Sequence, residues 1–110
     1  MDNLYGLKNS DIEKITEELS KEVEVELAIL FGSRAKGNFK PGSDVDIVLK
    51  GEKLNQKNVS NVSFTLNEDS LMPYKFDILN FTDITNKELL EHINRVGIIF
   101  YKRDVHLASH

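Results

Sequence analysis

The hydrophobic pattern at the beginning of the chain predicts a helix followed by a strand. Ser10, with Glu13 three residues later, has the spacing of a capping box, and the apolar residues that follow recur at helical intervals. These apolar residues are Ile12, Ile15, Leu19 and Val23. We therefore expect a helix over about residues 11–22. The β-branched and aliphatic run Val25–Phe31 stops at Gly32, which predicts a largely buried strand.

The next segment predicts a strand with two chemically different faces. Pro41 and Gly42 indicate a turn, and residues 44–49 alternate carboxylate and aliphatic side chains. One face carries aliphatic residues, namely Val45, Ile47 and Leu49. The other face carries Asp44, Asp46 and Val48.

The rest of the chain predicts two helices and two strands. Apolar residues at helical spacing indicate a helix within residues 54–66, and residues 74–81 after a proline indicate a third strand. Thr85 is expected to cap a last helix that Gly97 ends. Its apolar stripe is Leu89, Leu90, Ile93 and Val96. Residues 98–101 indicate a short final strand, and the pattern leaves open whether it is central or at an edge.

This order of elements predicts an α/β (α+β) fold in which helices cover a small mixed sheet. The 110 residues, 40% of them hydrophobic, are enough for one core, so residues 1–110 are expected to form a single domain. No apolar run approaches the roughly 20 residues of a membrane span, and a cytoplasmic protein with no membrane association is expected.

Charge and composition restrict the chemistry. Without cysteine, a metal would have to be held by oxygen or imidazole ligands, which favours hard cations. A net charge of -4 argues against a protein that binds long stretches of nucleic acid through phosphate contacts. A small phosphorylated ligand in a local basic pocket remains compatible with that charge.

The turn that begins at Gly32 has the features of a phosphate-binding segment. Glycine lets a ligand approach the backbone closely, and amide groups at such a turn can point outward. The Ser33 hydroxyl can donate to a phosphate oxygen, and Arg34 and Lys36 add positive charge. Both cations are also compatible with ordinary surface positions.

Asp44 and Asp46 project from the same face of the predicted strand, about 6–7 Å apart along it. Like charges so placed repel each other, and a cation with oxygen ligands, Mg²⁺ or Mn²⁺, would compensate them. Asp77 on the third strand is expected to reach the same cations, although it could instead pair with Lys75. Three carboxylates beside a phosphate-binding turn favour phosphoryl transfer with two metal ions.

Gly32-Ser33, ten intervening residues and then Asp44-Val45-Asp46 resemble the signature of the DNA polymerase beta-like nucleotidyltransferase superfamily. The small size is similar to that of its minimal, MNT-type members. The resemblance implies that Asp44 and Asp46 are metal ligands and that Gly32 and Ser33 hold the triphosphate. It also implies that Asp77 is the third carboxylate, which activates an acceptor hydroxyl.

Minimal members of this superfamily typically act with a HEPN-domain partner, and the best understood ones are antitoxins that add adenylyl groups to a tyrosine of the toxin. The resemblance thus implies transfer of AMP from ATP, or of another nucleoside monophosphate from its triphosphate, without a nucleic-acid template. The alternatives are an antitoxin that only binds its partner and a small-molecule transferase of the aminoglycoside-modifying type. Homo- or hetero-oligomers are both open. The spacing of His92, His106 and His110 suggests no metal site.

Overall fold

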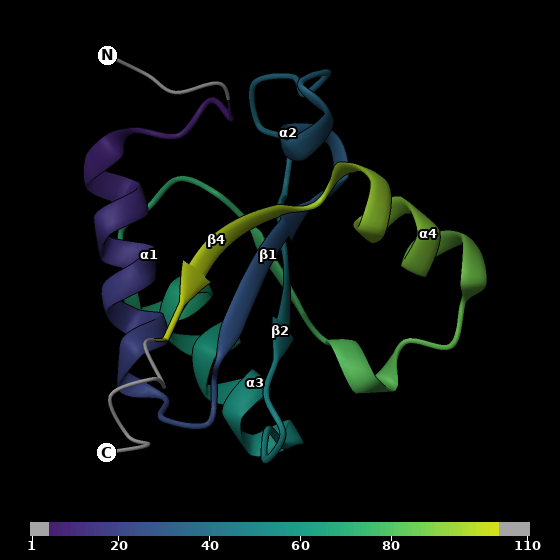
Figure 1. Cartoon of the computed structure of the whole chain (residues 1–110). Coiled ribbons are helices and arrows are strands. Elements are labelled where there is room, and N and C mark those ends of the chain that lie inside the picture. Colours follow the sequence, from purple (N-terminus) through teal and green to yellow (C-terminus); the bar gives the residue numbers. More distant parts are fainter. Residues whose placement is uncertain (1–4, 104–110) are drawn as a thin grey trace.

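The computed structural model describes residues 5–103 and contains a four-stranded sheet with helices on both faces (Figure 1). The strand order is β3-β2-β1-β4, with β1 antiparallel to both neighbours and β2 parallel to β3. The strands are β1 (Leu27–Phe31), β2 (Val45–Lys50), β3 (Phe76–Asn80) and β4 (Ile98–Lys102). The helices are α1 (Asn9–Lys21), α2 (Gly32–Lys36), α3 (Gln56–Phe64) and α4 (Lys87–Val96), with a π-helical turn η1 (Thr65–Asp69) and a 3-10 turn η2 (Phe81–Asp83). The predicted mixed sheet covered by helices is confirmed.

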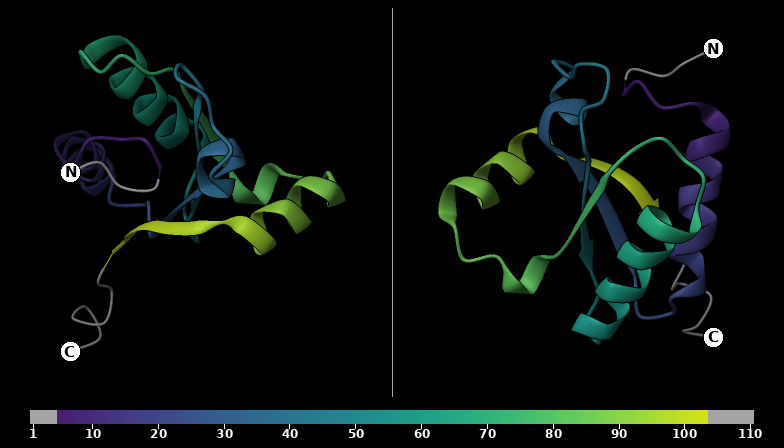
Figure 2. Two further views of the ribbon diagram at one scale, coloured as in Figure 1. Left: turned by 90° about the horizontal axis from the view of Figure 1, so that it is seen from above. Right: turned by 180° about the vertical axis from the view of Figure 1, so that it is seen from behind.

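The sheet separates two layers of helices. α1 and α3 cover one face, and α4 lies on the other (Figure 2). The aliphatic face predicted for β2 is fully buried beneath α1 and α3, and consists of Val45, Ile47 and Leu49. On the opposite face, Val48 packs with Phe31 and with Ile93 of α4. The alternation along β2 therefore directs its two faces to different layers of the molecule.

α1 begins earlier than predicted because the expected capping box does not form. Its N-cap is Lys8, which makes no side-chain cap, and Ser10 lies inside the first turn. Ile15 and Leu19 are fully buried, as their spacing predicts. The helix ends before Val23, which is 66% exposed, because the chain turns there toward β1.

Asparagine side chains begin both α3 and α4. Asn55 accepts a hydrogen bond from the Asn58 backbone N–H, and the Asn58 side chain accepts one from the Asn55 backbone N–H. This reciprocal capping box explains how an asparagine-rich segment forms a helix. α4 starts one residue later than predicted, because its N-cap is Asn86, which accepts from Leu89 N–H, and not Thr85.

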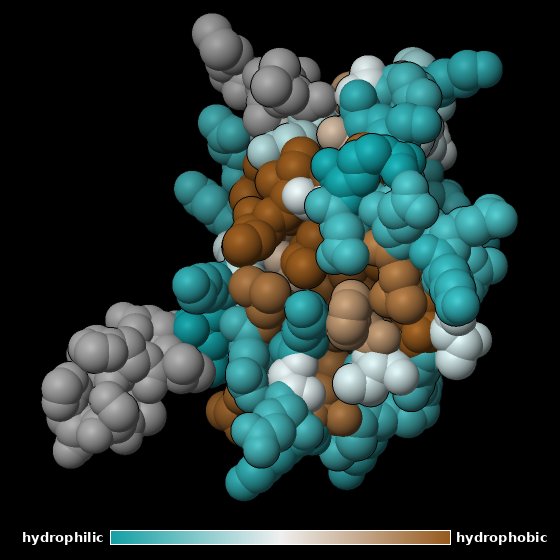
Figure 3. Space-filling model, turned by 45° about the vertical axis from the view of Figure 1, so that its right-hand side comes forward, coloured by the Kyte–Doolittle hydropathy of each residue, from teal (hydrophilic) through white to brown (hydrophobic). Residues whose placement is uncertain are grey.

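β4 is an edge strand, which answers the question that the hydrophobic pattern leaves open. It pairs with β1, where Ile99 lies opposite Ile29. Ile99 is 61% exposed, and the side of the molecule from which α4 extends shows an apolar surface flanked by polar side chains (Figure 3). Within residues 5–103, no helix combines the length and apolarity needed to cross a membrane.

Candidate active site

Two carboxylates lie on neighbouring strands at one end of the sheet, and a third directly precedes one of these strands. β2 begins directly after Asp44, and Asp46 lies opposite Phe31 at the end of β1. On the other side of β2, the parallel register places Asp77 of β3 beside Asp46. Paired positions share a face of a sheet, as do residues two apart on one strand. Asp46 and Asp77 therefore belong to the α4 side of the sheet, with Asp46 next to Gly32 and Asp44 just before the strand.

Asp46 is the central member of this group and is half-buried. Burial raises the pKa of its carboxyl, the charges of Asp77 and Asp44 raise that pKa further, and Arg34 acts in the opposite direction. Like charges directly opposite each other on adjacent strands are unfavourable. The arrangement therefore favours a bound cation that accepts oxygen ligands.

Asp44 and Asp77 are exposed at the rim of the sheet. Within the described part of the chain, no group of three or more His, Cys, Asp or Glu side chains is placed to hold a metal ion. The carboxylates thus do not form a closed metal site by themselves. Mg²⁺ commonly binds through one or two carboxylates together with water and substrate phosphates. The donor set fits a hard divalent ion held by Asp46 and a neighbouring acid, with its other coordination positions open to further ligands.

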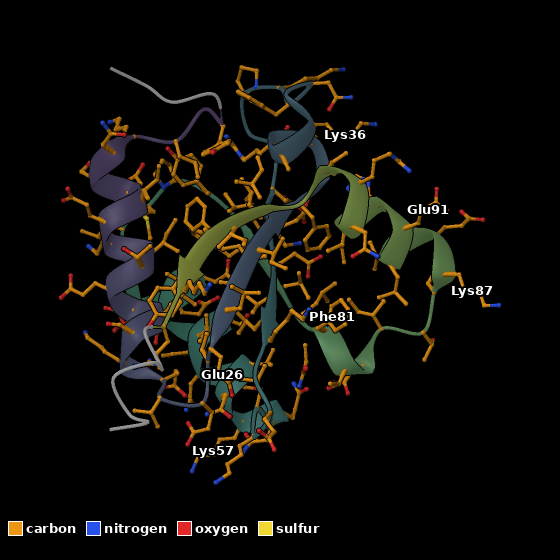
Figure 4. The ribbon with its side chains drawn as sticks, viewed as in Figure 1. Glu26, Lys36, Lys57, Phe81, Lys87 and Glu91 are labelled. Atoms are coloured by element: carbon orange, nitrogen blue, oxygen red, sulfur yellow. The ribbon has the colours of Figure 1, made fainter. Side chains whose placement is uncertain are left out.

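The turn from β1 into α2 is shaped by the protein's own packing. Gly32 has φ of 75°, and a Cβ there would overlap the Asp46 carboxylate, so Asp46 occupies the space that glycine leaves open. The Ser33 hydroxyl makes no hydrogen bond to any residue of the described range. Lys36 is exposed on α2, on the side of the molecule that also carries Glu91 of α4 (Figure 4). Ser33 and Lys36 are therefore free to contact a ligand.

Arg34 is only 3% exposed, and its position differs from the open phosphate contact that the sequence suggests. Its guanidinium donates from Nη1 to the Tyr5 carbonyl at 2.8 Å and from Nη2 to the Ser43 carbonyl at 2.9 Å. The guanidinium carbon also lies 5.2 Å from the ring centroids of both Phe39 and Tyr74. Arg34 thus joins the N-terminal segment, α2 and the loop before β2.

His92 of α4 contacts the turn, although the sequence pattern assigns it no role. Its Nε2 accepts a hydrogen bond from the Gly32 backbone N–H at 3.0 Å, and its ring meets the Phe31 ring edge-on. The amide of Gly32 is therefore not directed outward as predicted. Sixty positions separate the two residues, so no local pattern could have indicated this contact. His106 and His110 lie outside the described residues.

The sequence of this chain matches one known protein family over most of its length. Residues 13–106 match the family described as polymerase beta, nucleotidyltransferase. The chain belongs to this nucleotidyltransferase family. No curated protein sequence matches it.

Solved structures of toxin–antitoxin pairs have a similar fold. A toxin–antitoxin structure with AMP-PNP has a TM-score of 0.69 at 19% identity, over 87% of this chain and 77% of that one. A tri-AMPylated Shewanella oneidensis HEPN toxin in complex with an MNT antitoxin gives a TM-score of 0.65 at 16% identity, over 94% of this chain and 79% of that one. The structure of the MntA-HepT toxin–antitoxin gives a TM-score of 0.63 at 17% identity, over 90% of this chain and 76% of that one. This nucleotidyltransferase therefore shares its fold with chains of such pairs.

The site of this nucleotidyltransferase combines acidic side chains with a turn that carries a hydroxyl and a positive charge. Asp77 of β3 lies beside Asp46 of β2, and Asp44 precedes Asp46 by two residues. Beside them, Ser33 offers an uncommitted hydroxyl donor and Lys36 an exposed positive charge. These groups come from β1–α2, β2 and β3, so the sheet assembles the site.

Proposed function

We propose that this chain transfers AMP from ATP to a tyrosine hydroxyl of a HEPN-type toxin, and acts in this way as its antitoxin. The observation that carries the proposal is the register that sets Asp46 beside both Asp77 and the Gly32 turn. Similarity to a structure with AMP-PNP and to one with a tri-AMPylated HEPN toxin supports the choice of nucleotide and acceptor. In this proposal residues 1–110 act as one minimal catalytic domain.

In this proposal, different residues of the site bind the triphosphate and the metal ions. The Ser33 hydroxyl and the Lys36 ammonium bind oxygens of the triphosphate. Asp44 and Asp46 would hold Mg²⁺ or Mn²⁺, with two ions in the complete site, and Asp77 would be the third carboxylate. When bound, such ions neutralise the charge that develops on the phosphates during an in-line displacement.

Asp77 is assigned to the acceptor in this proposal, and its exposure, which would let a protein hydroxyl reach it, supports the assignment. The hydroxyl oxygen forms a bond to the α-phosphorus, and its proton passes to the Asp77 carboxylate. The bond from the α-phosphorus to the oxygen that bridges to the β-phosphorus breaks, and pyrophosphate leaves with the electron pair. Positioning of the two reactants contributes a large part of the rate enhancement.

Two residues predicted to bind nucleotide have supporting roles in this proposal. Arg34 orients the loop that leads to Asp44, and its charge offsets part of the negative charge around Asp46. Gly32 contributes the shape of the turn, because its amide is bonded to His92. Ser33 and Lys36 remain the direct phosphate contacts.

A second candidate function is an antitoxin that binds its partner without catalysis. The observation in its favour is that the carboxylates of residues 5–103 do not form a ready metal-binding group. In that case the repulsion around Asp46 has no catalytic purpose, and the partner is inhibited by occlusion.

Transfer to a small molecule has less support. Three cavities of the described chain have volumes of about 740, 370 and 340 Å³, and none of them is lined by Asp44, Asp46 or Asp77. Asp44 and Asp77 are instead exposed, and the exposed Ile99 lies opposite Ile29, which packs on the α4 side of the sheet. This setting fits an acceptor that is itself a protein.

The Asp44→Asn variant tests whether the chain is a catalyst. The purified HEPN-type partner is incubated with Mg²⁺ and α-labelled ATP, and the label on the partner is measured. Loss of one metal ligand should reduce transfer about a hundredfold or more, because metal charge stabilisation contributes several kcal/mol. The matched control is Asp83→Asn, an exposed acid on η2, which should transfer at the wild-type rate.

The same variants separate the two functions in cells. If Asp44→Asn transfers label normally, the proposed mechanism is wrong. If wild-type protein adds no label and Asp44→Asn still protects cells from the partner, the non-catalytic function is correct.

A further inference from the structure

The hydrogen bond between His92 and Gly32 links α4 to the phosphate-binding turn. Gly32 N–H donates to His92 Nε2 at 3.0 Å, so Nε2 must be unprotonated and the imidazole must carry its hydrogen on Nδ1. The bond is partly buried, which reduces competition from water. A neutral histidine of this tautomer therefore holds the first residue of α2.

Gly32 is held by His92 through its amide and lies next to Asp46, so its position affects both neighbours. Its φ of 75° turns the chain from β1 into α2, and a Cβ at this position would overlap the Asp46 carboxylate. Rotation of the Gly32 peptide would move Asp46 or the following Ser33. The imidazole thus supports the relative placement of an acid and a phosphate donor.

The surroundings of His92 keep its ring neutral. Burial lowers the pKa of the imidazole, and the cations Arg95 on the same helix and Lys36 on α2 lower it further. The Phe31 ring of β1 packs against it edge-on, with ring centroids 6.2 Å apart. α4 is anchored nearby by Ile93, which is buried against the sheet. The acceptor nitrogen is therefore available at neutral pH.

We propose that His92 is a positioning residue for nucleotide binding: its neutral imidazole holds the Gly32–Ser33 turn in the conformation that receives the triphosphate. The inference rests on the proposed function, because it concerns the same turn. His92 acts through Gly32 and does not touch the nucleotide. Its loss should therefore weaken nucleotide binding more than it slows the chemical step.

Two substitutions separate the acceptor from the bulk of the side chain. His92→Leu removes the acceptor, whereas His92→Gln keeps an amide oxygen near the position of Nε2 and does not titrate. Asn94→Leu, at an exposed position of the same helix, controls for adding leucine to α4. Circular dichroism and urea denaturation confirm that each variant is folded.

The affinity for Mg²⁺ and a non-hydrolysable ATP analogue is measured by calorimetry, and label transfer gives KM and kcat. At pH 8, His92→Leu should raise Kd and KM about threefold to tenfold, as expected for one hydrogen bond, with kcat within about twofold of wild type. His92→Gln and Asn94→Leu should remain close to wild type. Acidification below the imidazole pKa should weaken binding by wild type but less so by His92→Gln, because a protonated Nε2 cannot accept.

NMR of the ligand-free protein supplies an independent readout. The Nδ1–H tautomer of His92 and an exchange-protected Gly32 amide are expected. If both are seen and His92→Leu binds nucleotide like wild type, or if His92→Gln is as weak as His92→Leu, the positioning role is wrong. If wild-type protein binds no nucleotide, the proposed function fails and this role fails with it. If the tautomer differs while wild type binds nucleotide, only the His92 inference is overturned.

Discussion

The missing side chain of Gly32 leaves space that the Asp46 carboxylate of the same protein fills. The residue combines a φ of 75° with a position in which a Cβ would overlap Oδ2 of Asp46. Gly37, at the other end of the same short helix, has a φ of 88° but open space around the position of a Cβ. A side chain at Gly37 would therefore meet only the unfavourable backbone conformation, whereas one at Gly32 would also displace the Asp46 carboxylate.

We expect Gly32→Ala to lower the free energy of unfolding more than Gly37→Ala does. Left-handed backbone costs a non-glycine residue roughly 1–2 kcal/mol at either position. Only Gly32→Ala also forces Asp46 to move. Urea denaturation of both variants measures the difference, and equal losses would show that the carboxylate does not lie against Gly32.

Among the elements, α2 and the start of β2 depend on a single arginine. Arg34 binds the carbonyls of Tyr5 and Ser43, which precede α1 and β2, and all three belong to different segments of the chain. Because Ser43 is adjacent to Asp44, the hydrogen bond from Arg34 to the Ser43 carbonyl fixes the backbone position from which Asp44 projects. The hydrogen bonds of Arg34 thus serve the architecture of the site.

Arg34→Lys should destabilise the protein by about 2 kcal/mol, because an ammonium cannot reach both carbonyls or stack between the rings of Phe39 and Tyr74. The control is Arg95→Lys, where the exposed ion pair with Glu91 predicts a change within about 0.5 kcal/mol. Thermal and urea unfolding measure both variants. Similar effects at the two positions would contradict the structural role of Arg34.

Across the whole molecule, the sheet concentrates negative charge at one end. Strand order brings Asp46 and Asp77 side by side, although 31 positions separate them in the sequence. Burial and the neighbouring acids raise the pKa of Asp46, so the native state holds this proton more tightly than the unfolded chain does. The stability of the free protein therefore decreases as pH rises from 3.8 through the raised pKa, and the deficit persists at neutral pH.

Asp46→Asn should accordingly stabilise the ligand-free protein at pH 7. The gain should be roughly 0.2–1 kcal/mol, the usual size of a cross-strand charge interaction, and should vanish in acid, where the wild-type carboxyl is protonated. Unfolding is followed in EDTA from acid to neutral pH, with Asp83→Asn as the control. Added Mg²⁺ should stabilise wild type more than Asp46→Asn, and a variant less stable than wild type at pH 7 would contradict the charge argument.

The features that depend on neighbours along the chain could be predicted from the order of amino acids. The periods of apolar residues predict the ends of every strand to within two residues. They also place Val45 and Ile47 on the buried face of β2 and Asp46 on its other face. Such periods are readable because one face of each element must be buried. The spacing from Gly32 to Asp44 likewise indicates the family, since a turn and a strand start are local. Cap positions were missed where several polar residues compete, as at Asn86 and Thr85.

Contacts between residues far apart in the sequence became known only from the three-dimensional arrangement of the elements. The register of β2 with β3, the docking of α4 over the sheet and the burial of Arg34 depend on how the elements pack, and no local period encodes that packing. For this reason an arginine expected to contact phosphate connects the N-terminal segment to a loop, and a histidine without a motif holds Gly32. Charges and hydrogen bonds act through space, so their partners follow from the fold.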